Sequence, residues 1–213
     1  MISQERNGRI KNAVMDDLAD IVRVHRICFP KSFSTQLGEK LLECYYEEYL
    51  KRIPELFFIH LDNNNNIDGF CMGYILDENY PYMKKFINKN WFRIGCRLLF
   101  LAVTGNRLLF QKIKKTFVKE EYKVVQPLYY EDRKKGEFGD LLSICVLPEQ
   151  RGSGVAKDLV TEFENYLIEK DCKGCILSTN TDNERGIRFY LKCGYVIYSE
   201  SKNAVRFYKK LGI

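Results

Sequence analysis

The sequence predicts a mixed α/β fold that contains at least one pair of parallel strands. Three observations carry this prediction. Apolar residues spaced three and four apart mark several helices, and short apolar runs mark strands. In the last third of the chain, strands and helices alternate. A strand, a helix and a strand in succession indicate a βαβ crossover, which joins parallel strands.

The first third of the chain predicts a strand, two helices and a β-hairpin. Asp16 opens the first helix and Pro30 ends it. The hairpin turn is expected at Asn63–Asn66, because asparagine tolerates the left-handed backbone of tight turns. The expected elements are a strand over 9–13, a helix over 16–29, a loop over 31–36, a helix over 37–51, and strands over 56–61 and 67–76.

The middle segment, residues 84–135, carries the basic charge of the chain. It holds 14 Lys and Arg residues against four Asp and Glu residues, a net charge of +10, while the remainder carries −4. Apolar spacing predicts helices over Trp91–Val103 and Leu108–Phe117, followed by a polar loop over 131–139. We interpret residues 84–135 as a basic helical insertion in a single domain that spans residues 1–213.

The role of this insertion has three interpretations. The favoured one is a structural cover over the sheet with solvated Lys and Arg side chains. A lid over an acceptor site is the second, and contact of residues 91–117 with an anionic membrane surface is the third. Nucleic acid is not expected as a partner, because no helix-turn-helix or aromatic-interleaved basic pattern is present.

The last third predicts a glycine-bearing turn between a buried strand and a helix. Gly194 is expected to stop the final helix. The expected elements are a strand over 141–146, a turn over 148–154, a helix over 155–170, a strand over 175–179, a helix over 184–192, and strands over 195–199 and 204–208.

Composition favours a cytoplasmic protein without metal. The longest apolar stretch, Ile94–Val103, is interrupted by Arg97 and is shorter than the roughly 18 residues of a membrane span. The polar N-terminus does not resemble a secretory signal. Eight scattered cysteines are expected to be reduced thiols, and two histidines are too few to complete a zinc site.

The turn Arg151–Ala156 is the most informative segment. Gly152 and Gly154 allow the backbone to turn its N–H groups toward a ligand, and the following helix N-terminus adds partial positive charge. Such an element suits a phosphate or pyrophosphate. The alternative is a tight turn that binds nothing. A P-loop or a dinucleotide-binding loop fits poorly, because Lys157 stands where the dinucleotide loop needs its third glycine.

The R-x-x-G-x-A spacing of Arg151–Ala156 resembles the acetyl-CoA pyrophosphate loop of the GNAT superfamily of N-acetyltransferases. Residues Asn183–Tyr195 resemble its second signature, N-x-x-A-x-x-x-Y-x-x-x-G-F, with Gly186 and Tyr195 as departures. Residues 25–50 resemble the first helices of members found with bacterial surface-polysaccharide synthesis. The resemblance implies a twisted, mostly antiparallel sheet with a parallel, splayed strand pair and helices on both faces.

The resemblance also implies which residues hold acetyl-CoA. Backbone groups of Ile144 and Val146 would bind the pantetheine arm, and amides of the glycine loop would bind the pyrophosphate. Asn183 would bond the pantetheine, cap its helix, or do both. The implied cofactor-binding residues are Ile144, Cys145, Val146, Arg151, Gly152, Ser153, Gly154, Val155, Ala156, Lys157, Asn183 and Tyr190. For Arg151 and Lys157 the alternative is a solvated turn charge.

Two residues are candidates for acid–base chemistry. In the family a tyrosine at the position of Tyr190 protonates the leaving thiolate of CoA; the alternative is a core aromatic. Asp140 stands where some members carry a glutamate base, and the alternative is a plain strand-edge aspartate. Other members carry a base where this sequence has Ser178. Phe33 and Ser34, in the loop after the first helix, are candidate substrate-binding residues, and His25 is expected to be a core histidine.

The function implied is direct acetyl transfer from acetyl-CoA to an amine of a small molecule, with an amino sugar, free or nucleotide-linked, as the leading acceptor. The alternatives are a protein or peptide N-acetyltransferase and a non-catalytic acyl-CoA-binding module. The sequence leaves open whether the protein is a monomer or a homodimer.

Overall fold

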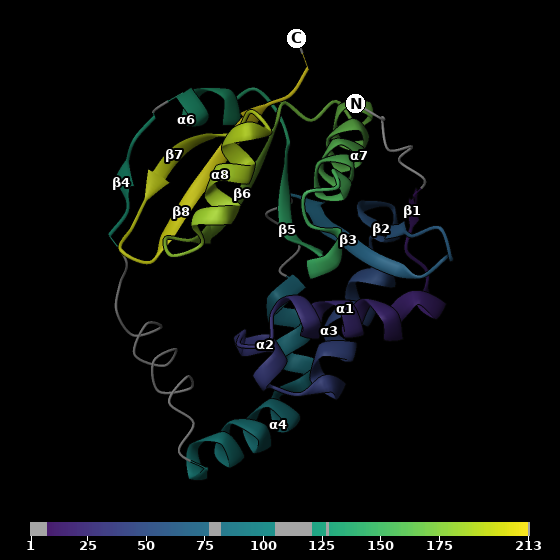
Figure 1. Ribbon diagram of the computed structural model, residues 1–213. Helices are drawn as coiled ribbons and strands as arrows, with labels where there is room; N and C mark the ends of the chain where they lie inside the picture. Colours follow the sequence, from purple (N-terminus) through teal and green to yellow (C-terminus); the bar gives the residue numbers. More distant parts are fainter. Residues whose placement is uncertain (1–7, 77–81, 105–120, 127, 213) are drawn as a thin grey trace. The chain divides into compact units, whose positions relative to one another are not determined.

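The computed structural model is mixed α/β and describes residues 8–76, 82–104, 121–126 and 128–212 (Figure 1). Hydrogen bonds join eight strands in the order β1-β2-β3-β5-β6-β8-β7-β4. The pairings β1–β2, β6–β8, β7–β8 and β4–β7 are antiparallel, and β5–β6 is parallel, as the βαβ pattern predicts. The strands are β1 Arg9–Asn12, β2 Phe57–Leu61, β3 Ile67–Ile75, β4 Lys123–Val124, β5 Phe138–Val146, β6 Gly174–Asn180, β7 Val196–Glu200 and β8 Ala204–Lys210.

The helices connect these strands. The α-helices are α1 Leu18–Cys28, α2 Phe33–Gln36, α3 Glu39–Leu50, α4 Tyr82–Val103, α6 Leu128–Arg133, α7 Val155–Glu169 and α8 Glu184–Lys192. Short 3-10 helices lie at η1 Met15–Asp17, η2 Pro54–Leu56 and η3 Pro148–Gln150. Within the described residues, no helix has both the length and the apolar character to cross a membrane. None of the eight cysteines, all of which the structure describes, forms a disulfide bond.

The chain forms two compact units. Unit 1 comprises Met1–Phe70, Glu78–Lys119 and Cys145–Ala156, and unit 2 comprises Cys71–Asp77, Glu120–Ile144 and Lys157–Ile213. In unit 1, α3 packs on α1 and α4. The fully buried ring of Tyr46 on α3 lies 5.8 Å from the Phe57 ring and 5.5 Å from the Phe70 ring, so this helix closes the core of unit 1.

Unit 2 has helices on both faces of its strands. On one face, Tyr129 of α6 lies 5.8 Å from the Phe138 ring and 5.7 Å from the Tyr208 ring. The opposite face carries Gly139, where an added Cβ would meet Leu167 of α7 at 2.2 Å. Because neighbouring residues of a strand point to opposite sides, α6 and α7 cover different faces. Figure 1 shows α8 across β6 and β8, on the side of α7.

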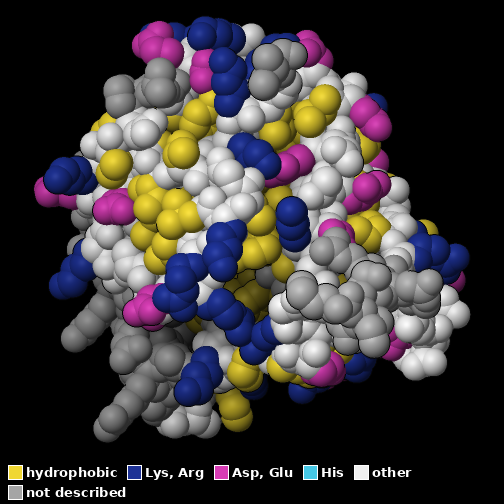
Figure 2. Space-filling view, turned by 45° about the horizontal axis from the view of Figure 1, so that its top comes forward, with side chains coloured by type: hydrophobic (Ala, Val, Ile, Leu, Met, Phe, Trp, Pro, Cys, Tyr) yellow, Lys and Arg dark blue, Asp and Glu magenta, His cyan; other side chains and the backbone are white. Residues whose placement is uncertain are grey.

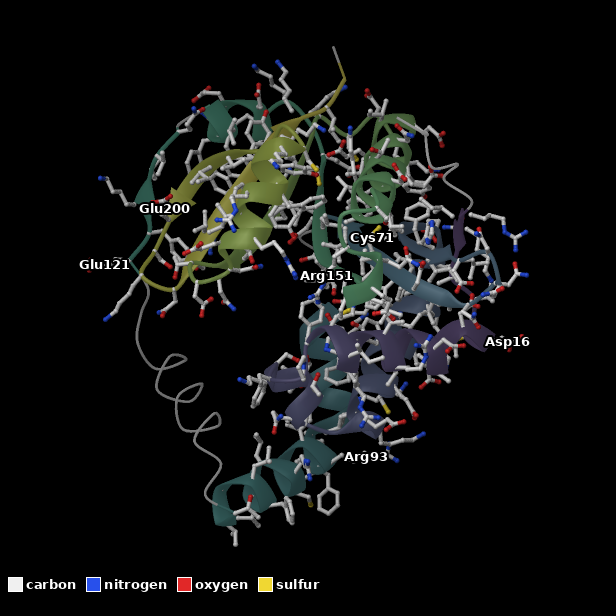
Figure 3. All side chains as sticks on the ribbon, in the orientation of Figure 1. Asp16, Cys71, Arg93, Glu121, Arg151 and Glu200 are labelled. Atoms are coloured by element: carbon white, nitrogen blue, oxygen red, sulfur yellow. The ribbon has the colours of Figure 1, made fainter. Side chains whose placement is uncertain are left out.

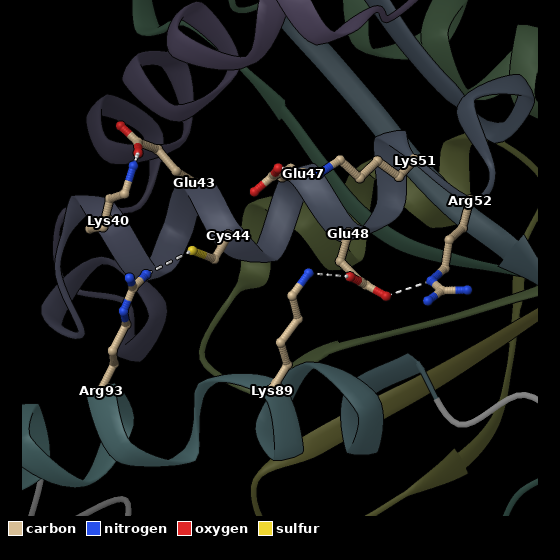
Figure 4. A network of polar contacts seen from close by, with 9 residues as sticks. All are labelled: Lys40, Glu43, Cys44, Glu47, Glu48, Lys51, Arg52, Lys89 and Arg93. Atoms are coloured by element: carbon tan, nitrogen blue, oxygen red, sulfur yellow. Dashed lines mark hydrogen bonds and ion pairs between the residues drawn. The ribbon is translucent and has the colours of Figure 1, made fainter.

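Two basic residues of helix α4 contact α3 within unit 1. Lys89 Nζ lies 3.6 Å from Glu48 Oε2, and Arg93 Nη1 donates to Cys44 Sγ at 3.7 Å (Figure 4). These contacts agree with a structural role for the helix. Its outer side exposes large apolar side chains, with Trp91 68% and Val103 80% exposed. Basic, acidic and hydrophobic side chains all appear on the face drawn in Figure 2.

Several predicted elements needed correction. The loop expected over 31–36 contains α2, whose first turn is capped by the Ser32 hydroxyl accepting from the Thr35 amide at 3.2 Å. The helix predicted from Trp91 begins at Tyr82, because Phe86 and Asn90 give this polar stretch a buried side. The predicted helix over 108–117 lies outside the described residues.

The prediction of a polar loop over 131–139 was also partly wrong. Helix α6 occupies its first residues and β5 begins at Phe138. The charged residues of this stretch concealed the helix, because Asp132 lies on the buried side of α6 and accepts a hydrogen bond from the Tyr208 hydroxyl. Strand β4 was missed, since two residues paired with Ser199 and Glu200 leave no periodic signal.

Candidate active site

The end of β5 and the glycine loop lie in unit 1. The Leu147 amide donates to the Asp68 carbonyl at 2.7 Å, and the Cys28 thiol donates to the Val146 carbonyl at 3.3 Å. The predicted pantetheine-binding residue Val146 therefore already holds one hydrogen bond from α1. A carbonyl oxygen has two lone pairs, so the Val146 carbonyl can still accept a second hydrogen bond.

The predicted pyrophosphate loop has the conformation that the glycines were expected to provide. Gly152 has φ +87° and Gly154 has φ +104°, both in the left-handed region. Ser153 is fixed between them, because its hydroxyl donates to the Gln150 carbonyl at 2.7 Å. No described residue accepts from the amides of Gly152 and Gly154. Two backbone donors without an acceptor among the described residues thus precede α7.

The start of α7 adds further donors. The first amides of a helix have no partner within the helix, and the helix dipole makes this end partially positive. Residues 152–156 belong to unit 1, and Lys157 begins the part of α7 that belongs to unit 2. The side chains of Arg151, labelled in Figure 3, and Lys157 are exposed. Chemically, this element is suited to bind phosphate oxygens.

The candidate base Asp140 is half-buried on β5 in unit 2. The Tyr74 hydroxyl of β3 donates to Asp140 Oδ2 at 3.3 Å. Burial raises the pKa of Asp140 to about 6, and the Tyr74 hydrogen bond and the charge of Arg206 oppose this shift. The close approach of β3 depends on Gly73, where a Cβ would meet the Asp140 carbonyl at 2.1 Å. A carboxyl with such a pKa is largely ionised at neutral pH and can accept a proton.

Strands β5 and β6 separate directly after Asp140. Their paired residues are Phe138 with Gly174, Gly139 with Cys175, and Asp140 with Ile176. Residues 141–144 are not paired with β6 in the described part of the chain. The predicted splayed parallel pair is therefore present. Unpaired backbone groups of two diverging strands can bind an extended ligand as an added strand would.

The candidate acid Tyr190 is buried on α8 in unit 2. Its ring lies 5.5 Å from the Phe207 ring and 6.1 Å from the Tyr195 ring. Burial raises the pKa of Tyr190 well above that of a free phenol, so the hydroxyl keeps its proton at neutral and alkaline pH. No described residue forms a hydrogen bond with this hydroxyl. The proton is available to a ligand.

Tyr190 and Asp140 approach β5 and β6 from opposite sides. Asp140 points to the face that α6 covers in part, whereas Tyr190 packs against Phe207 on the face of α8. The two side chains therefore lie on opposite faces of the strands, and their roles as base and acid stay predictions.

Asn183 caps α8. Its Oδ1 accepts from the Gly186 amide at 3.1 Å, and its Nδ2 donates to Thr179 Oγ1 at 2.8 Å. The predicted capping role is confirmed, and the predicted contact with pantetheine stays a prediction. Gly186, a departure from the family's alanine, leaves room for this amide, because an added Cβ would meet Asn183 Nδ2 at 2.3 Å.

The tentative substrate residues Phe33 and Ser34 lie on α2 in unit 1. His25 is buried, as expected, and its Nε2 lies 3.1 Å from Ser34 Oγ while its Nδ1 lies 2.6 Å from the Tyr46 hydroxyl. Burial lowers the pKa of His25 to about 4, so the ring is neutral near pH 7. Ser34 is thereby tied to the core of unit 1.

Sequence reasoning missed three residues of this region. Tyr74 positions Asp140, Thr179 positions Asn183, and Arg206 lies on the same strand face as Asp140. The alternation of side chains along a strand could have placed Tyr74 and Arg206 beside Asp140 only if the strand pairing had been known. Within the described ranges, no cluster of three or more His, Cys, Asp or Glu side chains has the geometry of a metal site.

Residues 121–195 match the sequence profile described as the acetyltransferase (GNAT) family. The matched segment contains β5, the glycine loop, α7 and α8. The predictions of an acetyltransferase and of acetyl-CoA as its co-substrate agree with this family. No curated protein sequence matches this chain.

Solved structures resemble nearly the whole chain. Ard1 from Thermoplasma volcanium is 17% identical with a TM-score of 0.57, and the alignment covers 97% of this chain and 99% of Ard1. PaiA N-acetyltransferase from Thermoplasma acidophilum, in complex with coenzyme A, is 15% identical with a TM-score of 0.57, covering 96% and 99%. Naa50 from Arabidopsis thaliana, in complex with a bisubstrate analogue, is 13% identical with a TM-score of 0.56, covering 95% and 98%. The chain therefore has the GNAT fold.

Proposed function

We propose that this protein is an N-acetyltransferase that transfers the acetyl group of acetyl-CoA to an amine. One observation carries the proposal: left-handed Gly152 and Gly154 precede α7 inside the segment that matches the acetyltransferase family. The amides of the glycine loop and of the first turn of α7 would hold the pyrophosphate. Arg151 and Lys157 would add positive charge beside it.

The pantetheine arm would bind along the open edge of β5. Backbone groups of Ile144 and Val146 are the proposed partners, and Cys145 and Asn183 are further proposed contacts. The support is the end of the β5–β6 pairing at Asp140, which leaves residues 141–144 of β5 unpaired with β6. Main-chain hydrogen bonds of this kind bind an extended ligand without requiring particular side chains.

The proposed chemistry is direct transfer. A neutral amine attacks the thioester carbonyl, the C–N bond forms and the C–S bond breaks. Asp140 accepts the amine proton, through a water molecule, and Tyr190 donates its proton to the departing sulfur. The backbone of the loop strand would stabilise the oxyanion. Cys145 is not needed as a nucleophile, because this route has no acyl-enzyme intermediate.

Two acceptor classes remain in view. The sequence resemblance favours an amino sugar, free or nucleotide-linked. A peptide N-terminus is the second candidate, favoured by the structure of Naa50, which was solved with the bisubstrate analogue CoA-Ac-MVNAL. Contact of the basic residues 91–117 with a membrane stays a sequence-based prediction.

Acetyl transfer can be measured as thiol release from acetyl-CoA with a panel of amino sugars, polyamines and short peptides. We expect release that depends on one class of amine, with N-acetylated product in equal amount. Thermal stabilisation by CoA without any amine-dependent release would instead indicate a non-catalytic acyl-CoA-binding module. Absence of both effects would contradict the proposed function.

A further inference from the structure

Arg206 occupies the same strand face as the candidate base. Asp140 pairs with Ile176 across β5 and β6, and Ile176 pairs with Tyr208 across β6 and β8. Arg206 is two residues from Tyr208 on β8, so its side chain points to the face of Asp140. This face is covered by α6 near Phe138 and Tyr208, and Asp140 and Arg206 lie further along it.

The guanidinium of Arg206 is held in place without an acidic partner. It lies 3.7 Å from the centroid of the Tyr122 ring, a cation–π contact that fixes its plane. Among the described residues, none forms an ion pair with it, although Glu121 and Glu200 lie on this edge of unit 2 (Figure 3). The charge of Arg206 is nevertheless close enough to lower the pKa of Asp140.

Two other partly buried cations of unit 2 have protein acceptors. Lys209 pairs with Glu164 at 2.6 Å, and Arg133 Nη1 donates to the Gly136 carbonyl at 3.2 Å. Withdrawing a charge from water is unfavourable unless another charge or hydrogen bonds compensate it. Within the described part of the chain, no residue accepts a hydrogen bond from the Arg206 guanidinium, and a guanidinium matches a carboxylate or a phosphate with two parallel hydrogen bonds.

We infer that Arg206 binds an anionic group of the acceptor, so that the acceptor is a primary amine that also carries a carboxylate or a phosphate. The inference rests on the proposed acetyltransferase function. The amine would face Asp140 and the anion would face Arg206. Two strand spacings of about 4.8 Å separate β5 from β8, so the two charges must lie several bonds apart in the acceptor.

The test compares acceptors that differ only in the anion. The panel pairs glucosamine 6-phosphate with glucosamine, 4-aminobutyrate with 4-aminobutanol, and a peptide with Asp at its second position with the same peptide carrying Asn. We expect the wild-type protein to prefer one anionic member at least tenfold in kcat/KM. In Arg206→Met, the KM for that member rises about ten- to a hundredfold, as for loss of a charge-assisted hydrogen bond, and the KM of its neutral partner changes less than twofold.

Arg188→Met is the matched control. Arg188 is exposed on α8 and pairs with Glu184 at 3.2 Å, so its loss changes the net charge equally and leaves the preference unchanged. Arg206→Lys, which keeps the charge but not the planar fork, should recover part of the affinity. The phosphate and carboxylate pairs identify which anion is bound.

The inference is overturned if only neutral amines are acetylated, or if Arg206→Met impairs anionic and neutral acceptors equally. The inference is also overturned if the protein binds CoA but acetylates none of the anionic amines. Each of these results is distinct from failure of the proposed function, which would appear as absence of CoA binding and of transfer to any amine.

Discussion

Burial raises the pKa of Asp140 and of Tyr190 without changing the protonation state of either group near neutral pH. Removal from water disfavours the charged form of each group, and this raises the pKa of both. The shift leaves the carboxyl ionised near neutral pH and the phenol protonated. A base and an acid in those states are what direct transfer from a thioester to an amine requires.

The pKa of Asp140 predicts the pH profile of the reaction. We expect kcat/KM, calculated on the concentration of neutral amine, to rise through an ascending limb near pH 6 and to level above it, because only the ionised carboxyl accepts the amine proton. Asp140→Asn should lose this limb and about a hundredfold of turnover. A profile unchanged in Asp140→Asn would show that another group is the base.

The same residue predicts a change in stability. Its pKa is raised by folding, so the native state binds more protons than the unfolded state between about pH 4 and 6, and the free energy of unfolding falls as pH rises through that range. Asp140→Asn removes the charge and should be more stable than the wild type above pH 6, by the order of 1–3 kcal/mol. Urea unfolding at pH 4 and pH 7.5 checks this. A difference that is equal at both pH values would contradict the raised pKa.

Tyr190 predicts a separation of binding from turnover. Tyr190→Phe keeps the ring that packs on Phe207 but removes the free hydroxyl. We expect a lower kcat with an unchanged Kd for CoA, measured by calorimetry beside steady-state kinetics. Full activity of Tyr190→Phe at every pH would assign the acid elsewhere.

At the scale of elements, sequence reasoning worked best where local chemistry dictates structure. Helix α8 was predicted with the same bounds, because Asn183 caps it and Gly194 ends it at φ +86°. The turn at residues 148–154 was predicted from its glycines. Helix α6 and strand β4 were not predicted, since their stability comes from Tyr129 stacking on Tyr198 and from pairing with β7, neither of which leaves a local pattern.

A change of glycine to alanine is expected to have opposite effects on stability at two positions. Gly152 has φ +87° and open space around it, so Gly152→Ala costs about 1–3 kcal/mol through backbone strain alone and should weaken CoA binding. Gly95 lies inside α4 with nothing within 4 Å, so Gly95→Ala should stabilise the protein by up to about 1 kcal/mol. Thermal unfolding and CoA titration of both variants check this. Equal effects at the two positions would contradict the loop conformation.

At the scale of the whole molecule, fold class and co-substrate followed from patterns that recur along the chain. The alternating strands and helices predicted the parallel pair, and the two signatures predicted the GNAT fold, which the structure has. The face formed by Tyr74, Asp140 and Arg206 did not follow, because these residues are far apart in sequence and meet only through strand register. The inference that the acceptor carries an anionic group depends on this face, so it could be drawn only from the structure.

The most direct measurement is a calorimetric titration of the full-length protein with coenzyme A, with 3′-phosphoadenosine diphosphate as the fragment that keeps the pyrophosphate. The account predicts that both bind at one site per chain, and that Gly152→Ala weakens both by a similar factor. Absence of binding heat at millimolar coenzyme A, in a protein shown to be folded, would contradict it.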